Sequence, residues 1–327
     1  AGRVAEPGAL DRGDLRAPVI RISRNESQRK ETRMPESIVI VGAKRTAIGS
    51  FLGQFTGVPT PTLGATAIKA ALEQAAVAPS DVNEVIMGCV LPANLGQAPA
   101  RQAALAAGLP KSAGCTTINK VCGSGMKAIM LAHDLVKAGS AHVVVAGGME
   151  SMTNAPHMIP NSRTGNRYGG FEAVDHMAWD GLTNPYDGKA MGIFAEATAD
   201  KYGFTRAEQD AFSVASVERA QAAIASGAFK EEIVPVTVAG RKGEVTHATD
   251  EQPGKSDVAK IPTLKPAFRK ENGTVTAASS SSISDGAAAT VVMSADEAFK
   301  RGIQPLARII AHATLAQRTA QGVALKY

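Results

Sequence analysis

Cys122 is the residue whose type and position best suit covalent chemistry. An extended run ends at Val121 and a helical pattern begins near Gly125, so this cysteine is expected on a strand-to-helix turn. Free backbone N–H groups and the positive end of a helix dipole favour a thiolate there. Gly123 and Gly125 allow a close backbone approach, and a nearby N–H could stabilise an oxyanion as a thioester is attacked. The segment predicts acyl transfer, although a buried structural cysteine is the ordinary alternative for any single cysteine.

The other two cysteines do not share that setting. Cys89 falls within a strand-like run, and Cys115 comes just before the run that leads to Cys122, so both are expected to be structural. Three cysteines without a Cys-x-x-Cys spacing predict neither a disulfide framework nor a zinc site, and no metal site is expected. This cysteine usage favours a reducing compartment, so a cytoplasmic location is expected.

Strand and helix patterns alternate around the turn. This alternation predicts an α/β fold in which helices cover a central sheet. The strands are expected at 38–41, 85–90, 116–121 and 142–146, and the helices around 63–75, 99–107 and 125–136.

The chain changes character between residues 151 and 276, where Pro, Asn and Gly are frequent and strand-like runs are few. One long helix is expected there. It begins at Thr205, with Glu208 three residues on as in a capping box, and it ends near Gly227. The apolar run at 287–293 then predicts a buried strand. We interpret the region as a loop-rich insertion.

Composition excludes several classes of protein. Among the 327 residues, 44% are hydrophobic and only 4% aromatic, which is typical of a soluble α/β protein. The net charge of +5 comes partly from residues 1–33 and does not indicate a nucleic-acid-binding protein, although it suits an anionic small ligand. No apolar run approaches the ~18 residues of a membrane span. No glycine-rich phosphate loop is present.

The segment from Asn119 to Gly125, Asn-Lys-Val-Cys-Gly-Ser-Gly, closely resembles the active-site signature of the thiolase family. Runs at 44–51, 96–102 and 146–152 also resemble thiolase segments, in the same order, and the resemblance extends from Met34 to about Thr314. It implies a thiolase-like layered α/β fold built from βαβαβαββ halves, the first of which holds an inserted loop domain. Homodimers or homotetramers are implied for the full-length form.

The resemblance also implies a reaction. Cys122 would take an acyl group from acetyl-CoA, and a second acetyl-CoA, deprotonated at its α-carbon, would attack that thioester. The products are acetoacetyl-CoA and CoA, and the reverse reaction is thiolytic cleavage. Coenzyme A thioesters are therefore the expected substrates, with no permanently bound cofactor, and fatty acid metabolism is the expected setting.

Six residues are implied as contacts for coenzyme A or the substrate. Leu182 and Met191 would form apolar walls along the pantetheine arm. Phe268, Ala277 and Ser281 would lie near the same arm, with Ser281 as its hydrogen-bonding partner. Lys255 is the nearest cation to the position where the family has an Arg at the nucleotide.

Two departures from the family pattern lie close to these positions. Many acetoacetyl-CoA thiolases have His where this chain has Ala190, so the hydrogen bond of that His is absent. The family usually has Asn where this chain has Ser279, which affects the local turn or the phosphopantetheine contacts.

The resemblance divides the chain into four parts. Met34 is interpreted as the start, with a leader or disordered extension before it. The parts are residues 1–33 as this extension, 34–152 plus 284–304 as the N-terminal thiolase half, 153–283 as the inserted CoA-binding loop domain, and 305–327 as a remnant of the second half with a divergent tail.

Several family motifs do not occur in the sequence. Gly-His-Pro, Cys-x-Gly and Asn-Glu-Ala-Phe, which supply acid/base groups and hold a water, are absent. A C-terminally truncated thiolase with little activity of its own is therefore expected. The alternatives are a longer-chain 3-ketoacyl-CoA thiolase, a condensing enzyme of the ketoacyl-synthase kind, and a non-catalytic acyl-CoA-binding remnant.

Overall fold

The computed structural model describes residues 37–165, 167–240 and 243–314, which belong to one compact unit. The extension expected at 1–33 and residues 315–327 of the expected tail lie outside the described residues. Within the described ranges, no helix has both the length and the apolar character needed to cross a membrane.

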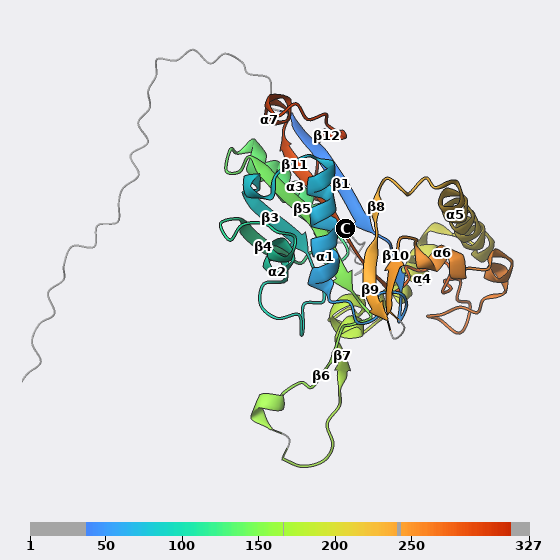
Figure 1. The fold of residues 1–327 in the computed structure, drawn as a ribbon. Coiled ribbons are helices and arrows are strands. Elements are labelled where there is room, and N and C mark those ends of the chain that lie inside the picture. The colour runs from blue at the N-terminus through green and yellow to red at the C-terminus, as the bar shows by residue number, and fades with distance from the viewer. Residues whose placement is uncertain (1–36, 166, 241–242, 315–327) are drawn as a thin grey trace, which may run out of the picture. The chain divides into compact units, whose positions relative to one another are not determined.

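A mixed sheet forms the centre of this unit (Figure 1). Its strands follow the order β12-β1-β11-β5-β3-β4. β5 pairs with β3 and β3 with β4 in parallel, whereas β11 runs antiparallel to both of its neighbours. The strands of this path are β1 (Ile38–Thr46), β3 (Glu84–Gly88), β4 (Gly114–Ile118), β5 (Val143–Ser151), β11 (Ser284–Ser294) and β12 (Ala307–Ile309). Two short strands outside this path also pair with the sheet, β2 (Gly49–Ser50) with β11 and β8 (Ile233–Val234) with β1.

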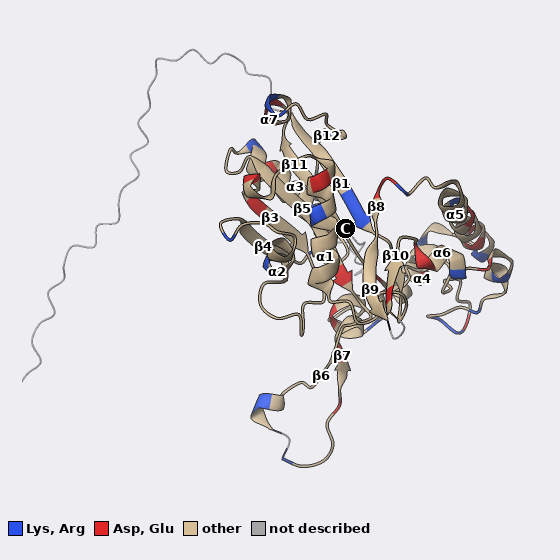
Figure 2. Ribbon diagram, in the orientation of Figure 1, with Lys and Arg blue, Asp and Glu red and all other residues tan. Residues whose placement is uncertain are grey.

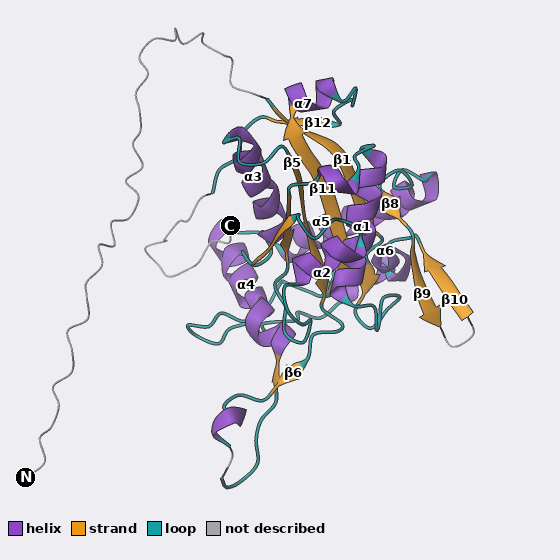
Figure 3. Ribbon diagram, turned by 60° about the vertical axis from the view of Figure 1, so that its left-hand side comes forward, coloured by secondary structure: helices purple, strands orange, loops and turns teal. Residues whose placement is uncertain are grey.

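Helices cover both faces of the sheet, as the alternating pattern predicted (Figure 3). α1 (Thr60–Gln74) and α2 (Pro99–Ala106) pack on one face around the larger apolar core, and α3 (Ser124–Lys137) packs on the other. A 3-10 turn (Pro79–Asp81) precedes β3, and α7 (Ala295–Lys300) follows β11. The order β1-α1-β3-α2-β4-α3-β5-β11 is the expected βαβαβαββ series, so the fold prediction is confirmed.

The insertion between β5 and β11 contains more regular structure than the sequence indicated. The expected helix is α5 (Arg206–Ser226), with the capping box at Thr205 and a left-handed Gly227 after it. The sequence did not predict α4 (Met191–Tyr202) or the hairpin of β9 (Val236–Gly240) and β10 (Gly243–His247). The remaining elements are β6 (His157–Met158), β7 (Val174–Asp175), α6 (Glu251–Lys255), 3-10 turns at Ser162–Thr164 and Val258–Thr263, and a π-helix at Met177–Leu182.

Two other expectations are corrected. Cys115 lies within β4 rather than before the strand, because the ladder with β3 begins at Gly114. The strand predicted at 142–146 continues to Ser151, since β11 pairs with it as far as Asp285.

Ion pairs attach the insertion to β1. The Arg45 guanidinium makes two hydrogen bonds to Asp250, of 2.7 and 2.9 Å, and a third of 2.7 Å to Glu232. Basic residues of β1 lie beside the insertion where β8 pairs with this strand (Figure 2). Because Asp250 also accepts the Ile48 N–H at 2.8 Å, it fixes the chain just beyond β1.

Glu251 fixes the turn that follows β2, at residues 50–54. Its carboxylate accepts the backbone N–H groups of Ser50 (2.9 Å) and Gln54 (3.0 Å), and it lies 2.6 Å from the Lys255 ammonium. Although partial burial alone would raise the pKa of Glu251, the hydrogen bonds from Gln54, Lys255 and Ser50 lower it to about 2.

This carboxylate should therefore contribute stability that depends on pH. Its folded-state pKa lies below the ordinary value of 4.5, so the contribution is present above about pH 4.5 and is lost as the pH falls through about 2. We expect Glu251→Gln to lower the free energy of unfolding at neutral pH by on the order of 3 kcal/mol. Urea denaturation at a series of pH values measures this loss, with Glu271→Gln, an exposed position, as the control. A loss that stays the same down to about pH 2 would contradict the assignment.

Candidate active site

Cys122 lies on a tight turn between β4 and α3. The Asn119 side chain accepts the Val121 N–H at 2.8 Å. The Ser124 hydroxyl accepts the Lys120 N–H at 2.8 Å and donates to the Val121 carbonyl at 2.6 Å. Val121 has a φ of 47°, a left-handed conformation that is strained for a β-branched residue. The Asn and Ser of the signature thus hold the strained backbone that presents the cysteine.

Gly88 lets this turn sit close against the sheet. A Cβ on Gly88 in β3 would lie 2.6 Å from the Ser124 Cβ and 2.7 Å from its carbonyl carbon. Gly125 also lies against Gly147 and Gly148 of β5, where an added Cβ would make ordinary van der Waals contact at 3.7 Å. The start of α3 therefore rests directly on the strands, and a larger side chain at Gly88 would displace Cys122.

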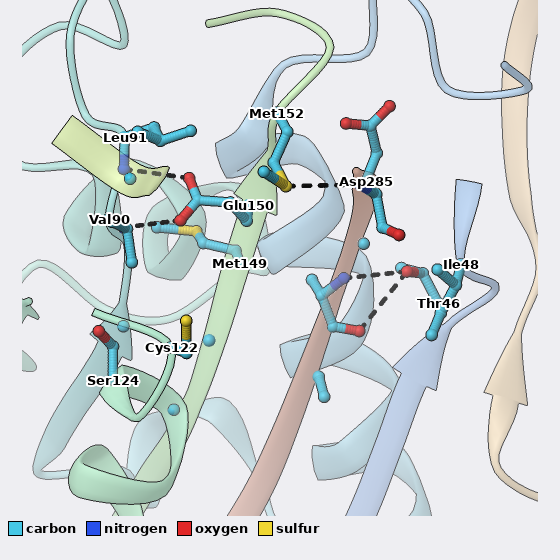
Figure 4. A pocket seen from close by; sticks show the side chains of 18 of the residues that line it. Thr46, Ile48, Val90, Leu91, Cys122, Ser124, Met149, Glu150, Met152 and Asp285 are labelled. Atoms are coloured by element: carbon cyan, nitrogen blue, oxygen red, sulfur yellow. Dashed lines mark hydrogen bonds between the residues drawn. The ribbon is translucent and has the colours of Figure 1, made fainter. Parts of the chain in front are cut away.

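An apolar cavity of about 420 Å³ opens beside the exposed Cys122 (Figure 4). Leu182, one of the predicted wall residues, lines the same cavity. Strands β3, β5 and β11 and the π-helix that ends at Leu182 contribute to its wall. Its apolar side chains include Ile48, Val90, Leu91, Met149, Met152 and Leu182.

Glu150 is an acidic residue in this largely apolar wall, and its role was missed by the sequence analysis. Its carboxylate accepts the backbone N–H groups of Val90 (2.7 Å) and Leu91 (3.2 Å), which fixes the loop after β3 (Figure 4). Burial raises its pKa, although these hydrogen bonds act in the opposite direction. The available signal was an acid at the end of the otherwise apolar strand β5.

The buried thiol of Cys89 lies 3.7 Å from Glu150. Burial, together with the adjacent carboxylate, raises the pKa of Cys89 to about 12. The prediction that Cys89 belongs to the core is confirmed. Its thiol remains protonated at physiological pH and is unsuited to nucleophilic attack.

The other predicted contacts lie in the insertion. Met191 begins α4, and the Phe268 ring packs against the next residue, Gly192, where an added Cβ would lie 2.2 Å from ring carbons. Ser281 belongs to a serine cluster at 279–282 and lines a second cavity of about 570 Å³, which lies between α5 and this cluster. Ala277 is exposed just before that cluster. The structure thus brings Cys122 together with Leu182, and Phe268 with the start of α4.

A fully buried carboxylate holds the segment that connects these contacts. Glu196 on α4, which is 1% exposed, accepts hydrogen bonds from the N–H groups of Thr274 (3.0 Å) and Val275 (2.9 Å). It also accepts the Thr274 hydroxyl at 3.1 Å. Thr274 and Val275 are therefore fixed to α4, between Phe268 and Ala277 in the chain.

Lys255 and the two positions that depart from the family pattern, Ala190 and Ser279, do not line the cavity beside Cys122. Lys255 forms an ion pair with Glu251 and lines neither of the two cavities described. Ala190 directly precedes α4. The Ser279 hydroxyl accepts the Thr276 N–H at 2.8 Å, so it caps a local turn.

This arrangement suits attack on a thioester. An exposed thiol lies beside an apolar cavity, and α3 begins two residues later, where backbone N–H groups of a first helical turn lack intrahelical partners. Such groups can stabilise the oxyanion that forms when a thiolate attacks a carbonyl carbon.

The three cysteines should differ in reactivity. At about pH 8, we expect iodoacetamide to modify Cys122 first, because it is exposed. Burial raises the pKa of both Cys115 and Cys89, so Cys115 should react slowly and Cys89 only after denaturation. Peptide mass spectrometry over time measures the three rates, and Cys122→Ser should remove the fast phase. Equal rates for Cys89 and Cys122 in the folded protein would contradict this expectation.

Comparisons with known proteins agree with this geometry. Residues 38–296 match the family model described as the thiolase N-terminal domain. An acetyl-CoA acetyltransferase of Cupriavidus necator is 53% identical over 278 residues, which are 84% of this chain and 70% of that protein. The acetyl-CoA acetyltransferase of Schizosaccharomyces pombe is 50% identical over 282 residues, or 86% of this chain and 71% of that protein. Since the family model covers most of the chain and the relatives are about half identical to it, the chain belongs to the thiolase family.

Proposed function

We propose that this chain is a thiolase of the acetyl-CoA acetyltransferase kind, which accepts an acyl group on Cys122 from a coenzyme A thioester. The observation that carries the proposal is the exposed Cys122 thiol on a strained turn beside an apolar cavity. Relatives that are named acetyl-CoA acetyltransferases support acetyl-CoA and acetoacetyl-CoA as the substrates.

The first half-reaction follows from this geometry. The Cys122 thiolate attacks the thioester carbonyl carbon, and backbone N–H groups near the start of α3 stabilise the oxyanion. A new carbon–sulfur bond forms to Cys122, and the bond to the coenzyme A sulfur breaks. The coenzyme A thiolate then leaves and takes up a proton. The products are an acyl-cysteine and free coenzyme A.

The second half-reaction joins two acyl units. A second acetyl-CoA loses a proton from its α-carbon, and the resulting carbanion attacks the acyl carbon of the acetyl-cysteine. A carbon–carbon bond forms, the carbon–sulfur bond to Cys122 breaks, and the Cys122 thiolate leaves as acetoacetyl-CoA is released and is free to take up a proton. This step needs a base, which the family places in motifs that the present sequence does not contain. The described residues therefore support the acylation step most directly.

Coenzyme A is proposed to bind along the insertion. Leu182 in the cavity wall, Met191 at the start of α4 and Phe268 against that start supply apolar surface for the pantetheine arm. Ser281 in the serine cluster supplies a hydroxyl, and Ala277 lies just before that cluster. Lys255 is proposed for the nucleotide, and it would exchange its ion pair with Glu251 for a phosphate.

Four wider assignments remain proposals that rest on the resemblance. They are a cytoplasmic location, a role in fatty acid metabolism, a homo-oligomeric full-length form, and the division into a thiolase half (34–152 plus 284–304) and an inserted domain (153–283). The pairing of Ser151 with Asp285 supports the last of these, because both ends of the insertion meet there.

Acylation of Cys122 can be tested directly. We expect incubation with acetyl-CoA to leave an acetyl adduct on the Cys122 peptide and to release free coenzyme A, because that cysteine is the exposed thiol at the cavity. Intact-mass and peptide mass spectrometry measure the adduct. Cys122→Ser should abolish it, whereas Cys115→Ser should retain it. A folded wild-type protein without an adduct, or a Cys122→Ser variant that still carries one, would overturn the proposal.

The length of the preferred acyl chain has a separate test. We expect acetyl-CoA to acylate Cys122 faster than a long-chain acyl-CoA, as the names of the relatives suggest. Rapid-quench mass spectrometry with each substrate compares the two rates on the wild-type chain. A faster reaction with the long-chain substrate would favour the degradative 3-ketoacyl-CoA thiolase instead.

A further inference from the structure

Two histidines and an aspartate converge at the other end of α3 from Cys122. His133 and Asp134 are neighbours on this helix, and His312 lies three residues after β12. His133 is buried, at 9% exposed, whereas the carboxylate of Asp134 is open to solvent and His312 is partly exposed. The two imidazole rings meet edge to face with their centroids 4.8 Å apart.

One atom of each side chain lies close to one atom of each of the other two. The distances are 3.0 Å from His133 Nδ1 to Asp134 Oδ1, 2.9 Å from His312 Nε2 to Asp134 Oδ1, and 3.1 Å from His312 Nε2 to His133 Nδ1. The three atoms therefore form a nearly equilateral triangle. Three ligands on one face of an octahedral ion, with bonds of about 2.1 Å, lie about 3.0 Å apart, whereas tetrahedral ligands at the same bond length lie about 3.4 Å apart.

Hydrogen bonds alone cannot satisfy all three contacts of this triangle at once. If both imidazole nitrogens donate to the Asp134 oxygen, neither has a lone pair to accept from the other, and the 3.1 Å contact brings two protonated nitrogens together. If one nitrogen donates to the other instead, its proton is no longer directed at the carboxylate. A cation removes the conflict, because it accepts a lone pair from all three atoms at once.

We propose that His133, Asp134 and His312 bind one divalent transition-metal ion of the zinc class, with water in the remaining coordination positions. Two imidazole nitrogens and one carboxylate oxygen suit zinc, cobalt or nickel, whereas magnesium and calcium prefer oxygen ligands throughout. The cysteine spacing gave no expectation of a metal site, and none of these ligands is a cysteine.

This metal site is separate from the proposed acyl transfer. His133 lies nine residues after Ser124, the first residue of α3. At a rise of ~1.5 Å per residue, roughly 14 Å of helix separate it from the turn of Cys122. The metal would instead join the segment after the edge strand β12 to α3. Its expected effect is therefore on stability, and it does not depend on the function proposed above.

Cobalt binding provides the main test. The full chain without a polyhistidine tag, carrying Cys122→Ser to remove the exposed thiol, is treated with a chelator and titrated with Co²⁺. We expect one Co²⁺ per chain, with visible d–d absorption, no sulfur-to-cobalt charge-transfer band, and displacement by Zn²⁺. We also expect Zn²⁺ to raise the melting temperature, because it binds the folded state.

Variants of the two less buried ligands decide the assignment. Asp134→Ala and His312→Ala should each weaken Co²⁺ binding at least about tenfold and abolish the thermal shift. His142→Ala, which removes an exposed histidine outside the cluster, should bind like the parent chain. The proposal is overturned if the parent chain binds no Co²⁺. It is equally overturned if His312→Ala binds as tightly as His142→Ala.

Discussion

The antiparallel pairing of β5 with β11 is the constraint on which the candidate site depends. The chain leaves the sheet after Ser151 and returns at Asp285, and these residues are partners in the ladder. The Ser151 hydroxyl and the Thr153 N–H both donate to the same Asp285 oxygen, at 3.1 and 3.0 Å. Both ends of the long insertion are thus fixed at one edge of the cavity that Cys122 lines. Without this pairing, the part of the cavity wall that the insertion supplies would have no fixed position relative to Cys122.

Carboxylate side chains accept hydrogen bonds from backbone N–H groups where regular strand pairing ends. Glu150, Glu196 and Glu251 each accept two backbone N–H groups from a segment distant in sequence. Buried backbone donors must find an acceptor, and an ionised carboxylate is a stronger acceptor than a carbonyl. Each of these side chains therefore holds the backbone of a distant segment, at the end of a strand or outside regular structure. Of the three, Glu150 does so in the wall of the cavity beside Cys122.

Sequence patterns predicted the features that depend on local interactions. The periodicity of β1, β3 and α1 to α3, the capping box at Thr205 and the turn at Cys122 are all set by residues a few positions apart. α4 was missed because its buried positions are Glu196 and Ala199, so burial leaves little apolar periodicity to detect. The role of Glu150 and the meeting of His133 with His312 depend on tertiary contacts, which no local pattern contains.

The position of β11 also determines the order in which the sheet can be completed. β11 lies between β1 and β5, which do not pair with each other in the strand order. Roughly 130 residues separate the end of β5 from the start of β11, so a ribosome adding ~5–20 residues per second needs on the order of ten seconds to make them. During that interval, β1 and β5 each expose a hydrogen-bonding edge that belongs to a strand not yet synthesised. Non-native strand pairing is the main folding hazard of this topology, and it ends only when residues 284–294 enter the gap.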